Sequence, residues 1–288
     1  MRRFKKETIT ILFVVGIVLM FYRSVYTKVD NAYISLPLGF VYVQKANSTE
    51  WVKATLNMQL LEGDKVKTLE KSRCEIKFAD KKIMRIGESS LVERIREEVK
   101  RSASISIGKL WINFITQTSD EEQLKVRTPT AVCAIRGTVY HLNCDSIHTK
   151  YRVYDGNIEI YPSKIDQGVL IDTSFSIANG KEMILVSDFE GYKKEQEKLF
   201  RDFLIQDQKK LQRFQQMEED AERQFRKKDD EGYQKFVQGS KSWEDFKKEL
   251  AAFKNYKSYF FNIRKFDLKE EEQTDWIKWN LQRDQEFK

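Results

Sequence analysis

The pattern of apolar and polar residues divides the chain into three parts of different texture. Residues 8–22 form an uncharged, almost wholly apolar run. Because this run has no polar face, it predicts a membrane helix rather than a helix buried in a soluble protein. Short alternating runs typical of strands follow from about residue 39 to residue 186. Beyond residue 187, apolar side chains recur every three or four residues, which predicts amphipathic helices.

The N-terminal apolar run is expected to anchor the chain in a membrane through residues 8–26. It is preceded by the basic residues Arg2, Arg3, Lys5 and Lys6. This basic cluster predicts a cytoplasmic N-terminus and directs the rest of the chain outward. A cleaved signal peptide is the alternative, but residues 21–28 contain no Ala-x-Ala pattern. Residues 1–28 therefore predict a cytoplasmic stub and a single transmembrane anchor in the inner membrane, with a periplasmic or extracytoplasmic remainder.

The middle of the chain, residues 36–187, is expected to be a β domain. Residues 74–78 alternate apolar and charged side chains, as a half-buried strand does, and residues 83–86 follow after a turn. Asp155-Gly156-Asn157 separates two further runs and predicts a hairpin, because Gly tolerates positive φ. Many short strands with frequent turns predict a roll, a solenoid or a sandwich.

Three segments of this β region carry a family signature. They are LEGDKVKT at residues 61–68, KVRTPTAVCAIRGTVY at residues 125–140 and VYDGNIEI at residues 153–160. In this order they resemble the FecR-domain family. The motif positions that the resemblance marks are Gly63, Asp64, Thr68, Arg127, Thr128, Pro129, Thr130, Arg136, Gly137 and Thr138.

The resemblance implies a mainly β, extracytoplasmic domain of the kind found in FecR-type regulators. Those proteins pass the signal of an outer-membrane receptor to a cytoplasmic sigma factor. They carry an anti-sigma domain before the membrane helix, whereas here Met1 to Glu7 precede it, too few residues to fold. The expected function is therefore that of a non-catalytic, membrane-anchored protein. It would act through protein–protein contacts in envelope scaffolding or signalling, with an unidentified partner.

The motif residues permit both a structural and a functional interpretation. Pro129 restricts Thr128 to extended backbone, which favours the start of a strand, and Gly137 suits a bulge. Arg136 lies in an otherwise apolar run, so its guanidinium needs carbonyl or carboxylate partners. Arg136 is either a clamp between neighbouring strands or a contact for a partner's carboxylate. The structural interpretation is favoured, because Thr, Pro and Gly are types that shape the backbone.

Composition argues against several other kinds of function. The net charge is +7, but basic and acidic residues are interleaved, so we expect solvated faces rather than a nucleic-acid surface. His141, Cys144 and His148, with Cys133 as a fourth ligand, have a spacing loosely compatible with zinc. No paired Cys-x-x-Cys accompanies them, so no metal and no cofactor is expected. No motif of a known catalytic site occurs, and the chain is not expected to be an enzyme.

Two further expectations concern the cysteines and an alternative function. The three cysteines, Cys74, Cys133 and Cys144, are expected to be buried thiols, with a bridge from Cys74 to either of the others as the alternative. The alternative function is that of a cell-wall glycan-binding envelope protein, motivated by the aromatic content and the basic balance. Exposed tryptophans in the β domain, such as Trp51 or Trp111, would favour it.

Residues 190–288 are expected to form a charged, amphipathic helical extension. Its first apolar stripe comprises Phe200, Phe203, Leu204, Leu211, Phe214, Met217, Ala221 and Phe225, and its second comprises Trp243, Phe246, Leu250 and Phe253. An uncovered stripe of this size is rare on a monomer. We expect the second helix to cover the first as a hairpin. Self-association through these helices and docking on the β domain are the alternatives.

Overall fold

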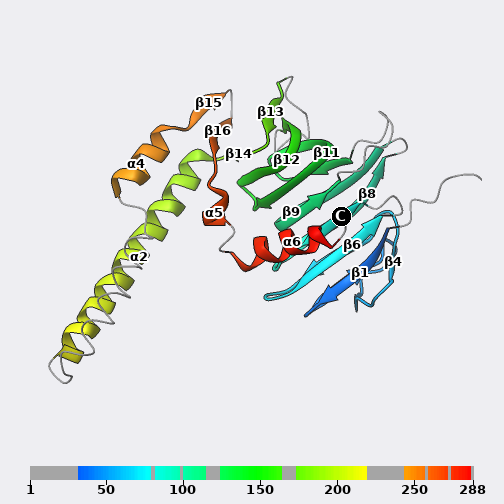
Figure 1. Cartoon of the computed structure of the whole chain (residues 1–288), viewed down its shortest axis with the longest axis horizontal. Helices are drawn as coiled ribbons and strands as arrows, with labels where there is room; N and C mark the ends of the chain where they lie inside the picture. The colour runs from blue at the N-terminus through cyan, green and yellow to red at the C-terminus, as the bar shows by residue number, and fades with distance from the viewer. Residues whose placement is uncertain are drawn as a thin grey trace, which may run out of the picture.

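A computed structural model describes residues 32–78, 82–97, 100–114, 124–163, 173–218, 243–256, 259–271 and 274–286. The predicted membrane segment at residues 8–26 lies outside these ranges. Among the helices of the described ranges, none is both long and apolar enough to cross a membrane. The described part of the chain is mainly β, as predicted, and carries helices in its C-terminal third (Figure 1).

The β region holds fourteen strands before the first described helix. They are β1 (Ala32–Leu38), β2 (Val41–Gln44), β3 (Trp51–Lys53), β4 (Gln59–Leu60), β5 (Lys65–Thr68), β6 (Arg73–Phe78), β7 (Ile83–Ile86), β8 (Ser90–Glu97), β9 (Lys100–Asn113), β10 (Leu124–Arg127), β11 (Ala131–Cys144), β12 (His148–Pro162), β13 (Phe175–Ala178) and β14 (Lys181–Val186). Strands β6 and β7 confirm the predictions at residues 74–78 and 83–86.

The C-terminal third mixes helices with two more strands. Its elements are α2 (Phe189–Glu218), α4 (Trp243–Ala251), β15 (Lys254–Tyr256), β16 (Tyr259–Lys265), α5 (Leu268–Glu271) and α6 (Asp275–Gln285). The prediction of a helical extension over residues 190–288 is therefore wrong for residues 254–256 and 259–265, which form strands. Strand β16 pairs antiparallel with β14, so a partner distant in sequence supplies the hydrogen bonds that make this segment a strand.

All the strands belong to one hydrogen-bonded network. Its main path runs β15-β16-β14-β12-β11-β10-β9-β7-β6-β1-β4, while β8, β5, β2 and β3 continue from β9 as a branch. The described pairings are antiparallel except that between β9 and β10. The long strands β9, β11 and β12 lie at the centre, and α6 crosses one face of the sheet (Figure 1). This arrangement places the chain's last described helix over strands from its first half.

Side chains on the inner face of the sheet make the core. The largest cluster of buried apolar residues runs from Ala32 to Tyr259 and takes alternate positions on most strands. Fully buried members include Ile34, Met84, Ile86, Leu110, Ile112, Tyr140 and Tyr151. Because the strands alternate, the residues between these positions point to the opposite face, the one crossed by α6.

The predicted hairpin at Asp155-Gly156-Asn157 is wrong. Strand β12 continues through all three residues, and its register with β11 shifts there, between Arg136 and Val139. Gly156 has a φ of 81° and approaches the backbone of β11 so closely that a Cβ would meet the Gly137 carbonyl oxygen at 2.6 Å. The Asp-Gly pair therefore forms a bulge, since positive φ serves a bulge as well as a turn.

Helix α2 projects away from the sheet (Figure 1). Its base packs on the sheet edge, where Phe189 stacks on Phe260 at 4.5 Å between ring centroids. Farther along, Phe200 stacks on Phe246 of α4 at 6.1 Å, so the described part of the predicted helical pair is in contact. Leu199 and Leu204 remain exposed to 56% and 44%. Among the described side chains of the stripe, α4 therefore leaves Leu204 exposed, and self-association through α2 stays a prediction.

Candidate functional site

The threonines of the family motif form a buried hydroxyl cluster. Thr128 and Thr130 flank Pro129 at the start of β11, and Thr130 lies 2.7 Å from the Thr149 hydroxyl. The Thr128 hydroxyl lies 3.1 Å from that of Tyr151 and accepts a hydrogen bond from the Ala131 N–H. Since buried hydroxyls must find partners, these residues fix the β11–β12 pairing. Their role in the structure is therefore internal.

The upstream motif fixes a loop. The carboxylate of Asp64 is buried and accepts hydrogen bonds from the Ala46 and Leu61 N–H groups and from the Lys45 ammonium, the last at 2.7 Å. Gly63 has a φ of 78°, and its N–H donates to the Arg94 carbonyl. Thr68 accepts from the Ser90 N–H and donates to the Gly87 carbonyl.

The remaining motif residues lie at two places on β10 and β11. Arg127 is exposed at the end of β10. Gly137 lies at the bulge, and the buried Thr138 hydroxyl beside it donates to the Asn157 carbonyl at 2.9 Å. The backbone of Arg136 pairs with Asn157, whereas its side chain lies outside the described atoms. The choice between clamp and partner contact at Arg136 therefore stays a prediction.

A second set of polar residues, absent from the motif, forms one row across the outer face of the sheet. Successive register partners from β6 to β16 are Glu75, Arg85, Trp111, His141, Arg152, Glu182 and Arg264. Carboxylates and guanidinium groups alternate at both ends of the row, which favours attraction between neighbouring strands. We call these residues the polar row.

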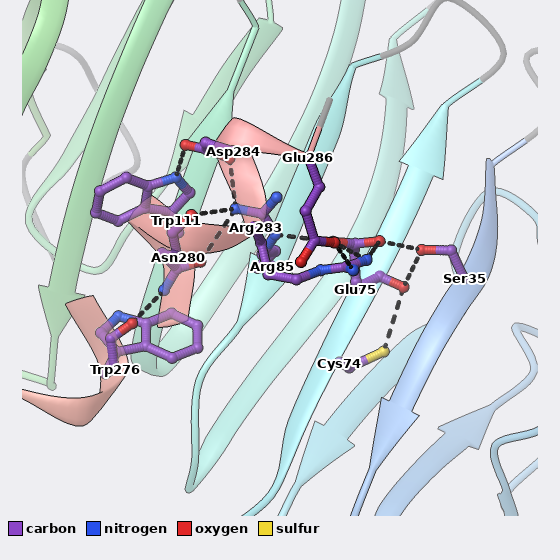
Figure 2. Close-up of polar contacts among 10 residues, drawn as sticks. All are labelled: Ser35, Cys74, Glu75, Arg85, Trp111, Trp276, Asn280, Arg283, Asp284 and Glu286. Carbon is purple, nitrogen blue, oxygen red and sulfur yellow. Dashed lines mark hydrogen bonds and ion pairs between the residues drawn. The ribbon is translucent and has the colours of Figure 1, made fainter. Parts of the chain in front are cut away.

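Helix α6 covers the first part of the polar row (Figure 2). Arg85 is fully buried, and its Nη1 donates to Asp284 Oδ1 at 2.6 Å and to the Asn280 carbonyl at 3.3 Å. Trp111 donates its indole N–H to the other oxygen of Asp284 at 2.9 Å. The two carboxylate oxygens of one helical residue thus receive donors from two neighbouring strands.

Glu75 completes this network from strand β6. Its carboxylate accepts from Arg85 Nε at 2.8 Å, from the Ser35 hydroxyl at 2.8 Å and from Arg283 of α6 at 3.1 Å (Figure 2). Burial alone would raise the pKa of Glu75. The hydrogen bonds from Arg85 and Ser35 and the charge of Arg85 outweigh burial and hold the pKa below its ordinary value. Glu75 is therefore a buried carboxylate kept charged by its partners.

Apolar contacts under α6 form a cluster separate from the main core. Trp276 and Ile277 of the helix pack against Trp111 and Val139 of the sheet. Arg73 contacts the N-terminal part of the same helix. The Arg73 guanidinium lies over the Trp279 ring, 5.1 Å from the ring centroid, and pairs with Asp275. Thr274 caps the helix by accepting from the Ile277 N–H. Docking of α6 thus combines a small apolar contact with several charged ones.

The other end of the polar row joins the C-terminal strands to the β domain. Glu182 is almost fully buried and pairs with Lys150, Arg152 and Arg264, of which Arg264 also contacts Glu249 of α4. Burial would raise the pKa of Glu182, but the charge of Lys150 and the hydrogen bonds from both guanidinium groups lower it. The two ends of the row therefore hold different C-terminal elements.

The four residues considered as zinc ligands do not form a metal site among the described residues. Cys133 and Cys144 are buried free thiols, as is Cys74, which agrees with the favoured prediction. His141 is buried beside Trp111 and Trp276, and burial lowers its pKa to about 3. Within the described ranges, no group of three His, Cys, Asp or Glu side chains is arranged to hold a metal ion.

The tryptophans bear on the glycan alternative. Trp111 is fully buried, so it offers no surface to a sugar ring. Trp51 is partly exposed, but the Lys67 ammonium lies over its ring at 4.2 Å from the centroid. Trp111 therefore offers no aromatic face to a sugar, whereas Trp51 keeps part of its surface exposed, and the glycan alternative stays a prediction.

The sequence-based choice of site residues missed Glu75, Arg85, Trp111 and Asp284. One available indication was Arg85 in the run Ile83-Met84-Arg85-Ile86, a lone charge among apolar residues. This is the same argument that singled out Arg136. The helix that supplies Asp284 lies 199 positions away from Arg85, and no local pattern connects the two.

Comparison with known proteins finds a family match within the β region. Residues 64–159 match the family model described as FecR protein. Two crystal structures described as a "putative anti-sigma factor" from Parabacteroides distasonis align with TM-scores of 0.36 and 0.35 at 11% identity. Each alignment covers 42% of this chain and 54% of the other, so the chain spans about half the length of these proteins. No curated protein matches the chain in sequence.

Proposed function

We propose that this chain, which carries a FecR domain over residues 64–159, is a non-catalytic, membrane-anchored protein that acts through protein–protein contacts on the extracytoplasmic side. The family match supports signalling by protein contacts. The sequence supports the anchor, through the uncharged run at residues 8–22 and the basic residues before it.

One structural observation carries the contact function. The buried polar groups of Arg85, Trp111 and Glu75, all on strands, are directed at helix α6 of the same chain. A face of this kind suits the recognition of a protein segment, because its donors and acceptors match the backbone and side-chain groups of a helix. The motif threonines and Asp64 are used within the domain. Together these contacts support a rigid β scaffold that presents a recognition face.

The proposed topology is tested by labelling engineered cysteines with a membrane-impermeant maleimide. The three native thiols are buried, which keeps the background low. Asn47→Cys places a thiol in an exposed loop of the β domain, and Lys5→Cys places one before the apolar run. In cells with an opened outer envelope and an intact inner membrane, we expect Asn47→Cys to be labelled.

The matched control is Lys5→Cys in the same cells. It should react only after the inner membrane is opened, because the basic N-terminus stays inside. Labelling of Lys5→Cys with protection of Asn47→Cys would reverse the orientation. Release of the labelled protein from the membrane fraction by carbonate would refute the anchor.

The glycan-binding alternative has a separate test. Full-length protein in detergent is mixed with purified cell wall and sedimented. We expect the protein to stay in the supernatant, since Trp111 is buried and the Lys67 ammonium occupies one face of the partly exposed Trp51 ring. Saturable co-sedimentation that Trp51→Ala abolishes would favour the glycan alternative over the contact function.

A further inference from the structure

We propose that the sheet face beneath α6 is a docking site for an amphipathic helix of a partner protein, and that α6 fills this site as a replaceable strap. The inference rests on the proposed function, because it names the surface through which a protein contact is made. The docking site comprises Arg73, Glu75, Arg85, Trp111 and Val139.

The site is complementary in charge to the helix it holds. Three ion pairs join the two, and in each the helix supplies the charge opposite to that of the sheet: Asp275 with Arg73, Arg283 with Glu75, and Asp284 with Arg85. Such matching specifies one orientation and one register of a bound helix, because a reversed helix would place like charges together. The site is therefore specific for a pattern of charges.

The centre of the site selects a carboxylate. Arg85 and Trp111 each donate to a different oxygen of Asp284, at 2.6 and 2.9 Å. An amide in place of the carboxylate would turn an NH2 group toward one of these donors. A helix that fits must carry Asp at this position, with Trp eight residues earlier, since positions four and eight apart share one helical face. Trp276, Asn280 and Asp284 have this spacing.

Several contacts indicate that α6 is held by a modest free energy. Its apolar contact with the sheet is limited to the buried Trp276 and Ile277 and the partly buried Trp279 and Leu281. Buried ion pairs add little net stability, because desolvation of the charges offsets their attraction. Among the described residues, the Trp276 indole N–H and His141 Nε2 are buried in this region without a hydrogen-bond partner. Each unpaired buried group lowers the free energy with which α6 is held. A partner helix with a hydrogen-bonding group at this place would avoid that loss.

Departure of α6 would leave the fold of the β domain intact. The main core extends from Ala32 to Tyr259 and includes no residue of α6, whose buried apolar residues belong to the separate cluster with Trp111 and Val139. Helix α6 also takes no part in the hydrogen-bonded pairing of the strands. A partner helix can therefore replace α6 by exchanging like contacts, without unfolding the domain that it binds.

The experiment measures binding of a helix in trans to the full-length protein in mild detergent. The probe is a fluorescein-labelled peptide with the sequence of residues 274–286. The strap variant, Trp276→Ala with Ile277→Ala in the chain, weakens the helix in cis. The matched control is Lys278→Ala, which changes an exposed position of the same helix. Fluorescence anisotropy reports binding.

We expect saturable binding to the strap variant, with roughly tenfold weaker binding to the wild-type and Lys278→Ala chains, where α6 competes. A peptide with Asp284→Asn should bind the strap variant roughly tenfold more weakly, because it loses one charged acceptor. A folded strap variant that does not bind the peptide overturns the proposal. So does equal binding to the strap variant and the wild type.

A second variant, which weakens the docking of α6 in another way, keeps the test valid if the strap variant does not fold. Asp275→Ala with Arg283→Ala retains Trp276 and Ile277 but removes two of the three ion pairs. It should bind the peptide more tightly than wild type, and failure to do so while folded counts against the site. Because the assay uses purified protein, its failure would leave the membrane topology untouched. Failed cysteine labelling would likewise leave the docking site standing.

Discussion

Trp111 of strand β9 donates its indole N–H to the carboxylate of Asp284 in helix α6, at 2.9 Å and across 173 positions of sequence. The indole is fully buried, and the same carboxylate accepts from Arg85. This hydrogen bond makes the position of the C-terminal helix depend on a strand in the middle of the FecR domain. Substitutions on either side should therefore loosen the helix before they unfold the sheet.

Asp284→Asn should detach α6 locally. After the change, Arg85 still has Glu75 as a charged partner. The loss in the free energy that docks α6 is therefore smaller than for an isolated buried charge, at about 2–3 kcal/mol. We expect the amides of residues 275–285 to exchange roughly 30-fold faster or more, with the strands unchanged. Hydrogen exchange measured by mass spectrometry checks this. Lys278→Gln is the control, and equal exchange in both variants would contradict the prediction.

Thr130→Val should destabilise the β domain as a whole. The substitution keeps the shape of the side chain but removes the hydroxyl that lies 2.7 Å from that of Thr149, which then keeps only its longer hydrogen bond to Thr128 at 3.3 Å. The expected loss is that of one buried hydrogen bond, about 0.5–1.5 kcal/mol in the free energy of unfolding. Denaturant unfolding followed by circular dichroism measures it. Thr55→Val, at an exposed position, is the comparison, and it should change stability by a few tenths of a kcal/mol at most.

Gly156→Ala and Gly180→Ala form a matched pair. Both glycines have positive φ, 81° and 74°, so alanine costs roughly 1 kcal/mol at either position through backbone strain. Only at Gly156 would the new Cβ also meet backbone, the Gly137 oxygen at 2.6 Å, whereas nothing lies within 4 Å of Gly180. We expect Gly156→Ala to lower the melting temperature clearly more than Gly180→Ala. Equal shifts would show that the bulge relaxes freely.

Acidification should destabilise the protein in two stages. Burial lowers the pKa of His141 to about 3, with the charges of Arg152, Lys109 and Lys150 acting in the same direction. The pKa of a histidine in the unfolded chain is about 6.5. The stability of the fold that depends on a neutral His141 is therefore fully present above about pH 6.5 and is lost as the pH falls toward 3. The lowered pKa values of Glu75 and Glu182 add a loss that begins only below about pH 4.3.

A variant separates the two stages. His141→Asn cannot gain a proton, so its melting temperature should stay nearly constant between about pH 6.5 and pH 5, where that of the wild type falls. Below about pH 4.3 both proteins should lose stability together. Differential scanning calorimetry across this range provides the measurement. Parallel slopes for the two proteins above pH 5 would refute the role of His141.

Sequence patterns predicted elements wherever neighbouring residues decide the conformation. Alternation at residues 74–78 predicted β6, and the helical period beyond residue 187 predicted α2. The same local argument failed at Asp155-Gly156-Asn157, because positive φ at Gly156 is compatible with a turn and with a bulge. Only the pairing of β12 with β11 on both sides of the glycine separates the two outcomes.

The sequence by itself determined the class of the β region, its FecR signature and the alternation that separates core from surface. Tertiary structure alone decided that β16 joins the sheet beside β14 and that α6 lies over Arg85 and Trp111. The reason is physical. Periodicity reports which side of an element is apolar, whereas the partner of a buried charge is chosen by geometry that forms only when distant segments meet.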